Sequence, residues 1–153
     1  MHLAELNISK WKVMPGSKAA RGFMDNLDLV NGLAERSDGF VWRLLGEGRD
    51  EKGNTPIGGM ETILTLSVWE TPMDLEHFVW NTVHKQIYNK KAEWFRHMES
   101  HHFVMWWVEE GHRPDLHEAK ERLDYLDKQG DSDHAFGWSH LPHMKIWQQQ
   151  RCA

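Results

Sequence analysis

The sequence of 153 residues contains a single cysteine, Cys152, next to its C-terminal end. One cysteine cannot form an internal disulfide, and it cannot supply a zinc site that needs several thiolates. This cysteine content is typical of a protein that folds in a reducing compartment. We therefore predict a cytoplasmic protein.

The sequence also lacks long apolar runs and concentrated positive charge. No window approaches the roughly 20 apolar residues that span a bilayer, and Glu5 interrupts the segment where a signal peptide would be apolar. The formal net charge is -5, and no basic run is present. These features argue against a membrane or a nucleic acid as the partner.

Tryptophan and histidine are abundant, with 9 and 11 residues respectively. A buried Trp removes roughly 150–250 Å² from water, so most of these indoles are expected to stabilise a core or an interface. The length predicts one core. We assign residues 1–130 to a single domain and residues 131–153 to an irregular tail that packs on the domain or on a partner subunit.

Hydrophobic periodicity predicts four strands and three helices. Alternating or β-branched and aromatic segments predict strands at residues 3–8, 40–45, 62–70 and 102–108. Apolar residues at helical spacing, together with capping residues, predict helices at residues 20–34, 72–98 and 116–129. The tail after Asp131 shows neither pattern.

The order of these elements predicts an α+β fold, the ferredoxin-like split βαβ arrangement with a four-stranded antiparallel sheet. The aliphatic side of strand 62–70 should face the helices. The other side, with Thr65, Ser67 and Trp69, should remain open. Two such faces packed together would form a homodimer, the dimeric α+β barrel.

Several short motifs together resemble a bacterial family known as a domain of unknown function. They are Asn7, Gly39-Phe40-Val41-Trp42-Arg43-Leu44, Ser67-Val68-Trp69-Glu70, Phe78-Val79, His84, Glu93-Trp94-Phe95, Trp106-Trp107-Val108 and Gly111-His112-Arg113-Pro114. The resemblance covers about residues 2–128. It implies membership of the dimeric α+β barrel superfamily, which contains small antibiotic-biosynthesis monooxygenases and haem-degrading monooxygenases. It transfers no reaction, because one fold hosts several chemistries.

His84 is the favoured catalytic residue of this chain. It belongs to the family pattern, and on the predicted helix it lies one turn from Trp80 and Tyr88, which are assigned to substrate binding. A neutral imidazole could act as a general base or as an axial haem ligand. A core histidine bonded to a backbone carbonyl is an alternative of equal weight.

Polar residues of adjacent strands should share a space with His84. Asn7 and Ser67 are predicted to orient a substrate oxygen, with Thr65 as a binding residue and Glu5 as a further candidate. The same groups could instead satisfy one another across the dimer.

The walls of this space are assigned to Trp42, Trp69 and Trp106, although core packing is the more frequent role for at least two of the three. Arg113 lies before a predicted helix, where it could hold a carboxylate or phosphate. A turn in which Arg113 pairs with a surface acid carries more weight.

No metal site is predicted, because the tail histidines lack regular structure to fix them. Three functions stay open. The first is an oxygenase-like enzyme acting on a small apolar or aromatic substrate. The second is a noncovalent haem protein with His84 as the axial ligand. The third is a non-catalytic dimeric binding module.

Overall fold

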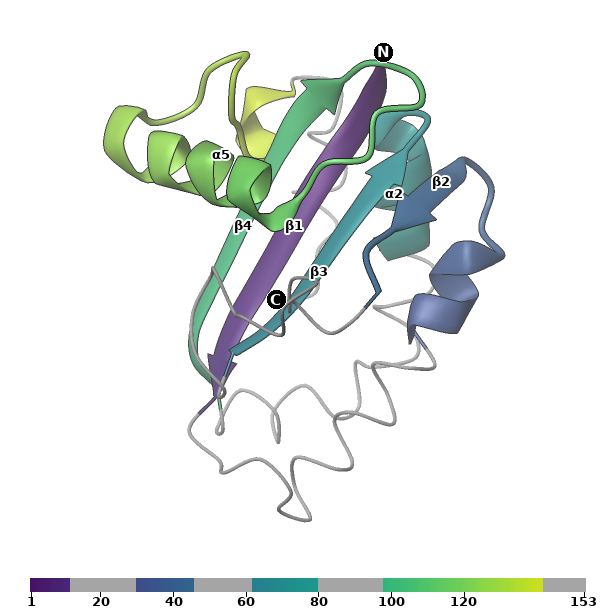
Figure 1. Ribbon diagram of the computed structural model, residues 1–153, viewed down its shortest axis with the longest axis horizontal. Helices are drawn as coiled ribbons and strands as arrows, with labels where there is room; N and C mark the ends of the chain where they lie inside the picture. Colours follow the sequence, from purple (N-terminus) through teal and green to yellow (C-terminus); the bar gives the residue numbers. More distant parts are fainter. Residues whose placement is uncertain (12–29, 46–61, 80–97, 142–153) are drawn as a thin grey trace.

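A four-stranded antiparallel sheet forms the centre of the protein. The computed structural model describes residues 1–11, 30–45, 62–79 and 98–141. The strands are β1 (His2–Trp11), β2 (Phe40–Arg43), β3 (Thr62–Trp69) and β4 (Met98–Val108), in the spatial order β2-β3-β1-β4 (Figure 1). This order confirms the predicted α+β class and the ferredoxin-like arrangement.

The predicted strands are confirmed, with differences at their ends. The first strand is longer than predicted and the second is shorter. The last strand begins at Met98, four residues before the predicted start at His102. The helix that starts at Pro72 therefore cannot extend to Met98, and residues 80–97 of that predicted helix lie outside the described residues.

Side-chain caps start the two longer helices of the described part. At α2 (Pro72–Phe78), the Oγ1 atom of Thr71 accepts a hydrogen bond from the backbone N–H of Asp74 at 3.1 Å. At α5 (Leu116–Gln129), the Oδ1 atom of Asp115 accepts from the backbone N–H of Glu118 at 2.8 Å. Both caps were predicted from the sequence. Residues 30–35 are also helical, and residues 12–29 lie outside the described part.

The described helices offer no candidate for a membrane span, because none is both long and apolar enough to cross a bilayer.

One face of the sheet is aliphatic and packs against α5. The apolar side of α5 contacts it through buried side chains, with α5 crossing the strands as Figure 1 shows. The buried cluster consists of Ala4, Leu6, Ile8, Leu64, Leu66, Val68, Val104, Trp106, Val108, Leu116, Ala119, Leu123 and Ala135. The prediction that the aliphatic side of β3 meets a helix is therefore confirmed.

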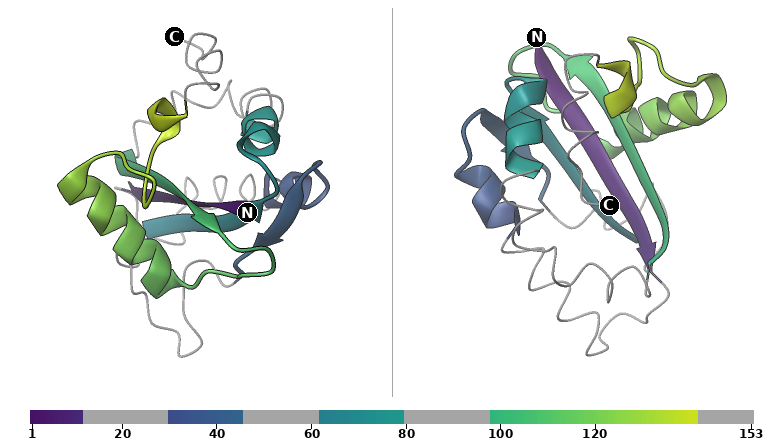
Figure 2. Two further views of the ribbon diagram at one scale, coloured as in Figure 1. Left: turned by 90° about the horizontal axis from the view of Figure 1, so that it is seen from above. Right: turned by 180° about the vertical axis from the view of Figure 1, so that it is seen from behind.

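The opposite face is covered as well, by α2 and by the 3₁₀ helix η3 (Trp138–His140) (Figure 2). Trp69 is 1% exposed and Ser67 is 7% exposed within a single chain. The prediction that this side remains open was wrong, because α2 and the C-terminal segment lie over it. A partner subunit is not needed to bury these residues, and the homodimer stays a prediction.

Residues of the C-terminal segment extend the edge of the sheet. The backbone N–H of Met105 donates to the carbonyl of Phe136 at 2.8 Å, and the N–H of Phe136 donates back at 2.9 Å. Phe136 and Leu141 are buried against the second core cluster. Residues 131–141 therefore pack on the domain, while residues 142–153 lie outside the described part.

The contribution of the α5 cap to the stability of the fold can be tested directly. We expect Asp115→Ala to lower the free energy of unfolding by about 1 kcal/mol, because the N–H of Glu118 would lose its acceptor at the start of the helix. Asp115→Asn is the matched control and should retain most of the stability. Urea denaturation followed by circular dichroism measures both. Equal stability of the Ala variant and the wild type would contradict a role for this cap.

Candidate functional site

The candidate site lies on the α2 side of the sheet, on three alternate rungs of the strand ladder. Each rung joins a residue of β3 to its partner on β1 and to the next partner on β4. The rungs are Trp69–Leu3–Trp107, Ser67–Glu5–Met105 and Thr65–Asn7–Phe103. Because residues two apart on a strand face the same side, these side chains share one face.

A buried hydrogen-bond chain connects the first two rungs. The indole Nε1–H of Trp69 donates to the Oγ atom of Ser67 at 3.0 Å. The hydroxyl of Ser67 donates in turn to the Oε1 atom of Glu5 at 2.6 Å. Glu5 is 6% exposed, so a carboxyl group is held inside the protein by a defined donor.

Burial raises the pKa of the Glu5 carboxyl to about 7 from its ordinary value of 4.5, because an ionised carboxylate is poorly stabilised away from water. The hydrogen bond from Ser67 opposes this effect, since it favours the charged form. Both protonation states of Glu5 are therefore accessible near neutral pH. A group of this kind can accept or donate a proton in chemistry at a bound ligand.

The face becomes less covered along the strands. Ser67 and Glu5 are buried, whereas Asn7 and Thr65 on the next rung are half-buried. An amide and a hydroxyl therefore flank the carboxyl on its more accessible side. Such groups can hold an oxygen or nitrogen atom of a ligand.

Aromatic rings lie over β3 and over β4 on the face that carries Glu5. Over β3, Trp69 stacks on Phe78 of α2 with ring centroids 5.2 Å apart. Over β4, Trp138 of η3 stacks on Phe103 at 5.8 Å. Seen along the sheet, α2 and η3 stand on the same side of the strands (Figure 2). The surroundings of Glu5 on this face are therefore largely aromatic.

Two of the three predicted tryptophan walls lie on the other side of the sheet. Trp42 pairs with Val68 and Trp106 pairs with Ala4, so both face the aliphatic cluster near α5. Trp106 is 0% exposed and donates its indole N–H to Glu118 at 2.9 Å. The prediction that Trp42, Trp69 and Trp106 line one space was wrong, because alternate strand residues face opposite sides.

The structure places the other predicted residues as follows. Arg113 is exposed in the connection between β4 and α5, beyond the strand end and away from the Glu5 rung. Its neighbour His112 contacts Glu118 through Nε2 at 2.7 Å. His84, Trp80 and Tyr88 lie outside the described residues, so the histidine base and the haem ligand stay predictions.

From the sequence, Glu5 is only a further candidate, whereas in the structure it is the acceptor at which the hydrogen-bond chain ends. The available signal was the alternation of residues 3–8, which sets Glu5 and Asn7 on the side opposite Leu6. The sequence does not specify how β1 is aligned against β3. In the structure this alignment places Glu5 opposite Ser67 rather than opposite an apolar residue.

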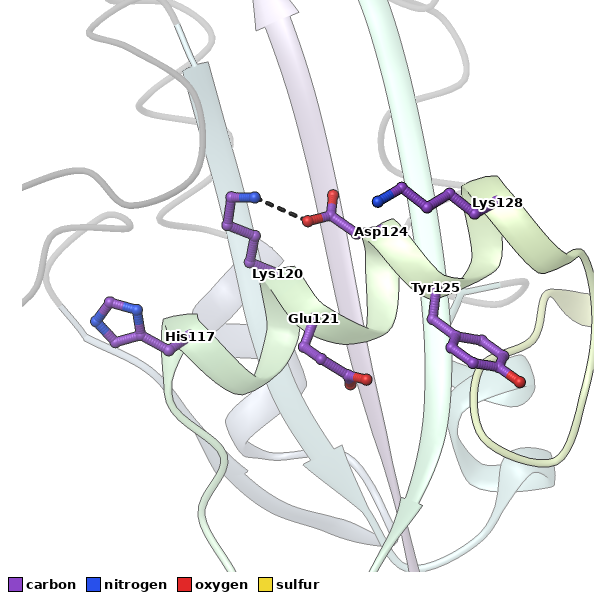
Figure 3. Close-up of a pocket in the computed structure, with 6 residues that line it drawn as sticks. All are labelled: His117, Lys120, Glu121, Asp124, Tyr125 and Lys128. Atoms are coloured by element: carbon purple, nitrogen blue, oxygen red, sulfur yellow. Dashed lines mark hydrogen bonds and ion pairs between the residues drawn. The ribbon is translucent and has the colours of Figure 1, made fainter.

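A surface hollow of about 410 Å³ lies elsewhere, along the outer side of α5 (Figure 3). Its lining residues all belong to that helix, and Lys120 and Asp124 form an ion pair at 2.8 Å within it. They are His117, Lys120, Glu121, Asp124, Tyr125 and Lys128. Since α5 covers the aliphatic face, this hollow lies on the side of the sheet opposite Glu5 and does not belong to the site.

Within residues 1–11, 30–45, 62–79 and 98–141, no group of three His, Cys, Asp or Glu side chains lies close enough together to hold a metal ion. In the tail, His134 contacts Glu121 through Nε2 at 2.8 Å, and His140 contacts Asp133 at 3.1 Å.

Solved structures similar to this protein share its fold at low sequence identity. A Nitrosomonas europaea protein described as a candidate antibiotic-biosynthesis monooxygenase aligns with a TM-score of 0.51 and 11% identity, covering 73% of this chain and 94% of that one. A protein of unknown function from the same organism gives 0.50 and 13%, covering 74% and 94%. A Mycobacterium tuberculosis protein gives 0.50 and 12%, covering 73% and 100%.

No curated protein matches the sequence. A family model described as a domain of unknown function (DUF3291) matches residues 2–152. The match includes the tail after Asp131, which the sequence resemblance had left outside the family. Because it spans nearly the whole chain, the protein belongs to the DUF3291 family.

Proposed function

We propose that this protein binds a small, largely apolar molecule against the Glu5 face of the sheet and exchanges a proton with it in an oxygenase-like reaction. The observation that carries the proposal is the buried carboxyl of Glu5, whose pKa is about 7 and whose partner is the hydroxyl of Ser67. A general base is most effective when its pKa lies near the working pH.

The chemistry that suits this group is removal of a proton from an acidic CH₂ next to a carbonyl. The resulting carbanion reacts with O₂, so that the CH₂ becomes a carbonyl and the second oxygen atom leaves as water. The substrate supplies all the electrons, and no external reductant is needed. In this scheme Glu5 accepts the first proton, and the aromatic rings of Trp69, Phe78 and Phe103 keep the surroundings apolar.

Among the polar neighbours of Glu5, Ser67 is proposed to take a role different from the predicted one, while Asn7 and Thr65 keep theirs. The hydroxyl hydrogen of Ser67 is directed at Glu5, so Ser67 acts on the carboxyl rather than on a substrate oxygen. Asn7 and Thr65, on the half-buried rung, are proposed to hold that oxygen.

The fold shared with the Nitrosomonas europaea monooxygenase candidate is consistent with an oxygenase-like reaction. At 11% identity it supports the architecture alone, so the reaction is proposed from the residues of this chain. The predicted haem ligand, His84, lies outside the described residues, so a haem site stays a prediction.

The ionisation of Glu5 should be visible in the stability of the protein. Burial favours the protonated form of Glu5. The contribution of this group to the free energy of unfolding is therefore fully present below pH 4.5 and is lost as the pH rises through about 7. The difference between these two pKa values corresponds to about 3 kcal/mol. We expect Glu5→Gln to approach wild-type stability at pH 4.5 and to exceed it above pH 7, as measured by urea denaturation at several pH values.

Glu109→Gln is the matched control for this experiment, because Glu109 is exposed and its substitution also removes one carboxyl. Its stability should follow the wild type across the pH range. If Glu5→Gln and the wild type showed the same pH dependence, Glu5 would not change charge in the folded protein near neutral pH.

Oxygen uptake tests the proposed reaction directly. With anthrone, a flat tricyclic ketone with an acidic CH₂, the wild type should consume O₂ at a rate that rises with pH, with its midpoint near pH 7, to a plateau at higher pH. Glu5→Gln should lower kcat/KM roughly 10²- to 10⁴-fold, because the amide cannot accept the proton. An oxygen electrode measures the rates against the spontaneous oxidation of the ketone.

His84→Ala separates the two candidate bases. Loss of uptake in His84→Ala with full activity in Glu5→Gln would assign the base to His84 and leave Glu5 a structural role. The control variant Glu109→Gln should retain wild-type uptake.

A further inference from the structure

Trp69 is almost fully enclosed on the Glu5 face, with 1% of its surface exposed. Its indole lies edge-on to Phe40 at 5.5 Å and stacks on Phe78 at 5.2 Å, with a plane angle of 26°. Phe78 is the last residue of α2, a helix that Thr71 caps at its start. The ring is therefore held from two sides, and packing fixes the direction of its N–H group.

The direction of the hydrogen bonds follows from the donor and acceptor capacity of each group. An indole nitrogen can only donate, so the Oγ atom of Ser67 must accept from Trp69. A serine hydroxyl has one hydrogen, and an ionised carboxylate can only accept. When Glu5 is ionised, the chain therefore runs in one direction, from Trp69 to Ser67 to Glu5.

We propose that Trp69 is a positioning residue that acts through Ser67, because its indole N–H occupies the serine oxygen and holds the hydroxyl hydrogen toward the Oε1 atom of Glu5. The proposal rests on the proposed role of Glu5 in proton transfer. It replaces the predicted role of Trp69 as a wall that contacts the substrate. With Oε1 engaged by Ser67, the second carboxyl oxygen is the one that exchanges a proton with a ligand.

Consecutive hydrogen bonds polarise one another, so a negative charge on Glu5 strengthens the bond from Ser67 and, through it, the bond from Trp69. The indole N–H of Trp69 should therefore report the protonation state of a carboxyl two hydrogen bonds away. A tryptophan that only fills space would show no such response.

Other ionisable groups must be separated from this response. The elements over this face carry Asp74, Glu76 and His77 on α2, Glu35 on helical residues 30–35 with Arg36 in the turn after them, and His140 on η3. Within the sheet, Arg43 of β2 is the strand partner of Ser67. Among the described residues, burial raises the pKa of Glu5 and the Ser67 hydrogen bond partly lowers it, and no charged side chain is among the causes of the shift. Glu5→Gln removes the ionisation while keeping the shape of the side chain, so it isolates the effect of Glu5.

The test is a pH titration of the full-length ¹⁵N-labelled protein, followed through the indole N–H signals in ¹H–¹⁵N correlation spectra. Trp69→Phe identifies the Trp69 signal by its loss. We expect this signal to move downfield between pH 5 and 9, with a midpoint near 7. Glu5→Gln and Ser67→Ala should each abolish the shift, and Ser67→Thr, which keeps the hydroxyl, should restore it.

A second measurement follows Glu5 itself through its carboxyl ¹³C signal. Ser67→Ala should move the Glu5 midpoint to higher pH, because the ionised form loses its donor. Trp69→Phe should move it in the same direction by a smaller amount, because the serine hydroxyl becomes a weaker and less directed donor. Trp107→Phe, at the other end of the rung that carries Trp69, is the matched control and should leave the midpoint unchanged.

A Trp69 signal that ignores both pH and Glu5→Gln would overturn the proposal, and so would an unchanged Glu5 midpoint in Trp69→Phe. If Trp69→Phe does not fold, nuclear Overhauser contacts of the Trp69 indole with the rings of Phe40 and Phe78 assign its signal instead, and the response of that signal to Glu5→Gln and Ser67→Ala decides the question. A titrating Trp69 signal in a protein whose oxygen uptake does not depend on Glu5 would support the hydrogen-bond chain and contradict the proposed function. The two failures are therefore distinguishable.

Discussion

The register between β1 and β3 is the constraint on which the site depends. It sets Glu5 opposite Ser67 and Leu3 opposite Trp69, so that a carboxyl, a hydroxyl and an indole N–H come within hydrogen-bond distance on one face. A slip of one residue would turn Glu5 toward the aliphatic cluster and α5. The same register therefore keeps the aliphatic core free of charge and collects the polar groups on the other side.

A buried carboxyl opposes folding unless it is neutral or well bonded. Here the hydrogen bond from Ser67 only partly offsets the loss of hydration, and the pKa of Glu5 is raised as a result. The extensive aliphatic cluster on the other face supplies the stability that tolerates this group. A residue that lowers stability at neutral pH and yet lies among aromatic side chains is more consistent with a chemical role than with a purely structural one.

The C-terminal segment adds a feature that the ferredoxin-like fold does not require. Phe136 pairs with Met105 at the edge of β4, and Trp138 stacks on Phe103 beside the half-buried end of the site. With α2 on the other side, the face that carries Glu5 lies between two aromatic surfaces of the same chain. The family match over residues 2–152 includes this segment.

The sequence by itself determined the strands, the capped starts of α2 and α5, and the ferredoxin-like order of elements, because alternation and capping are local properties of the chain. It also identified Asn7, Thr65, Ser67 and Trp69 as members of one face. Only the tertiary structure decided that α2 and the tail cover this face, that Trp42 and Trp106 turn away from it, and that Glu5 is its centre. Strand register and the side on which a helix packs arise from contacts between residues far apart in the chain, and periodicity within one segment does not specify them.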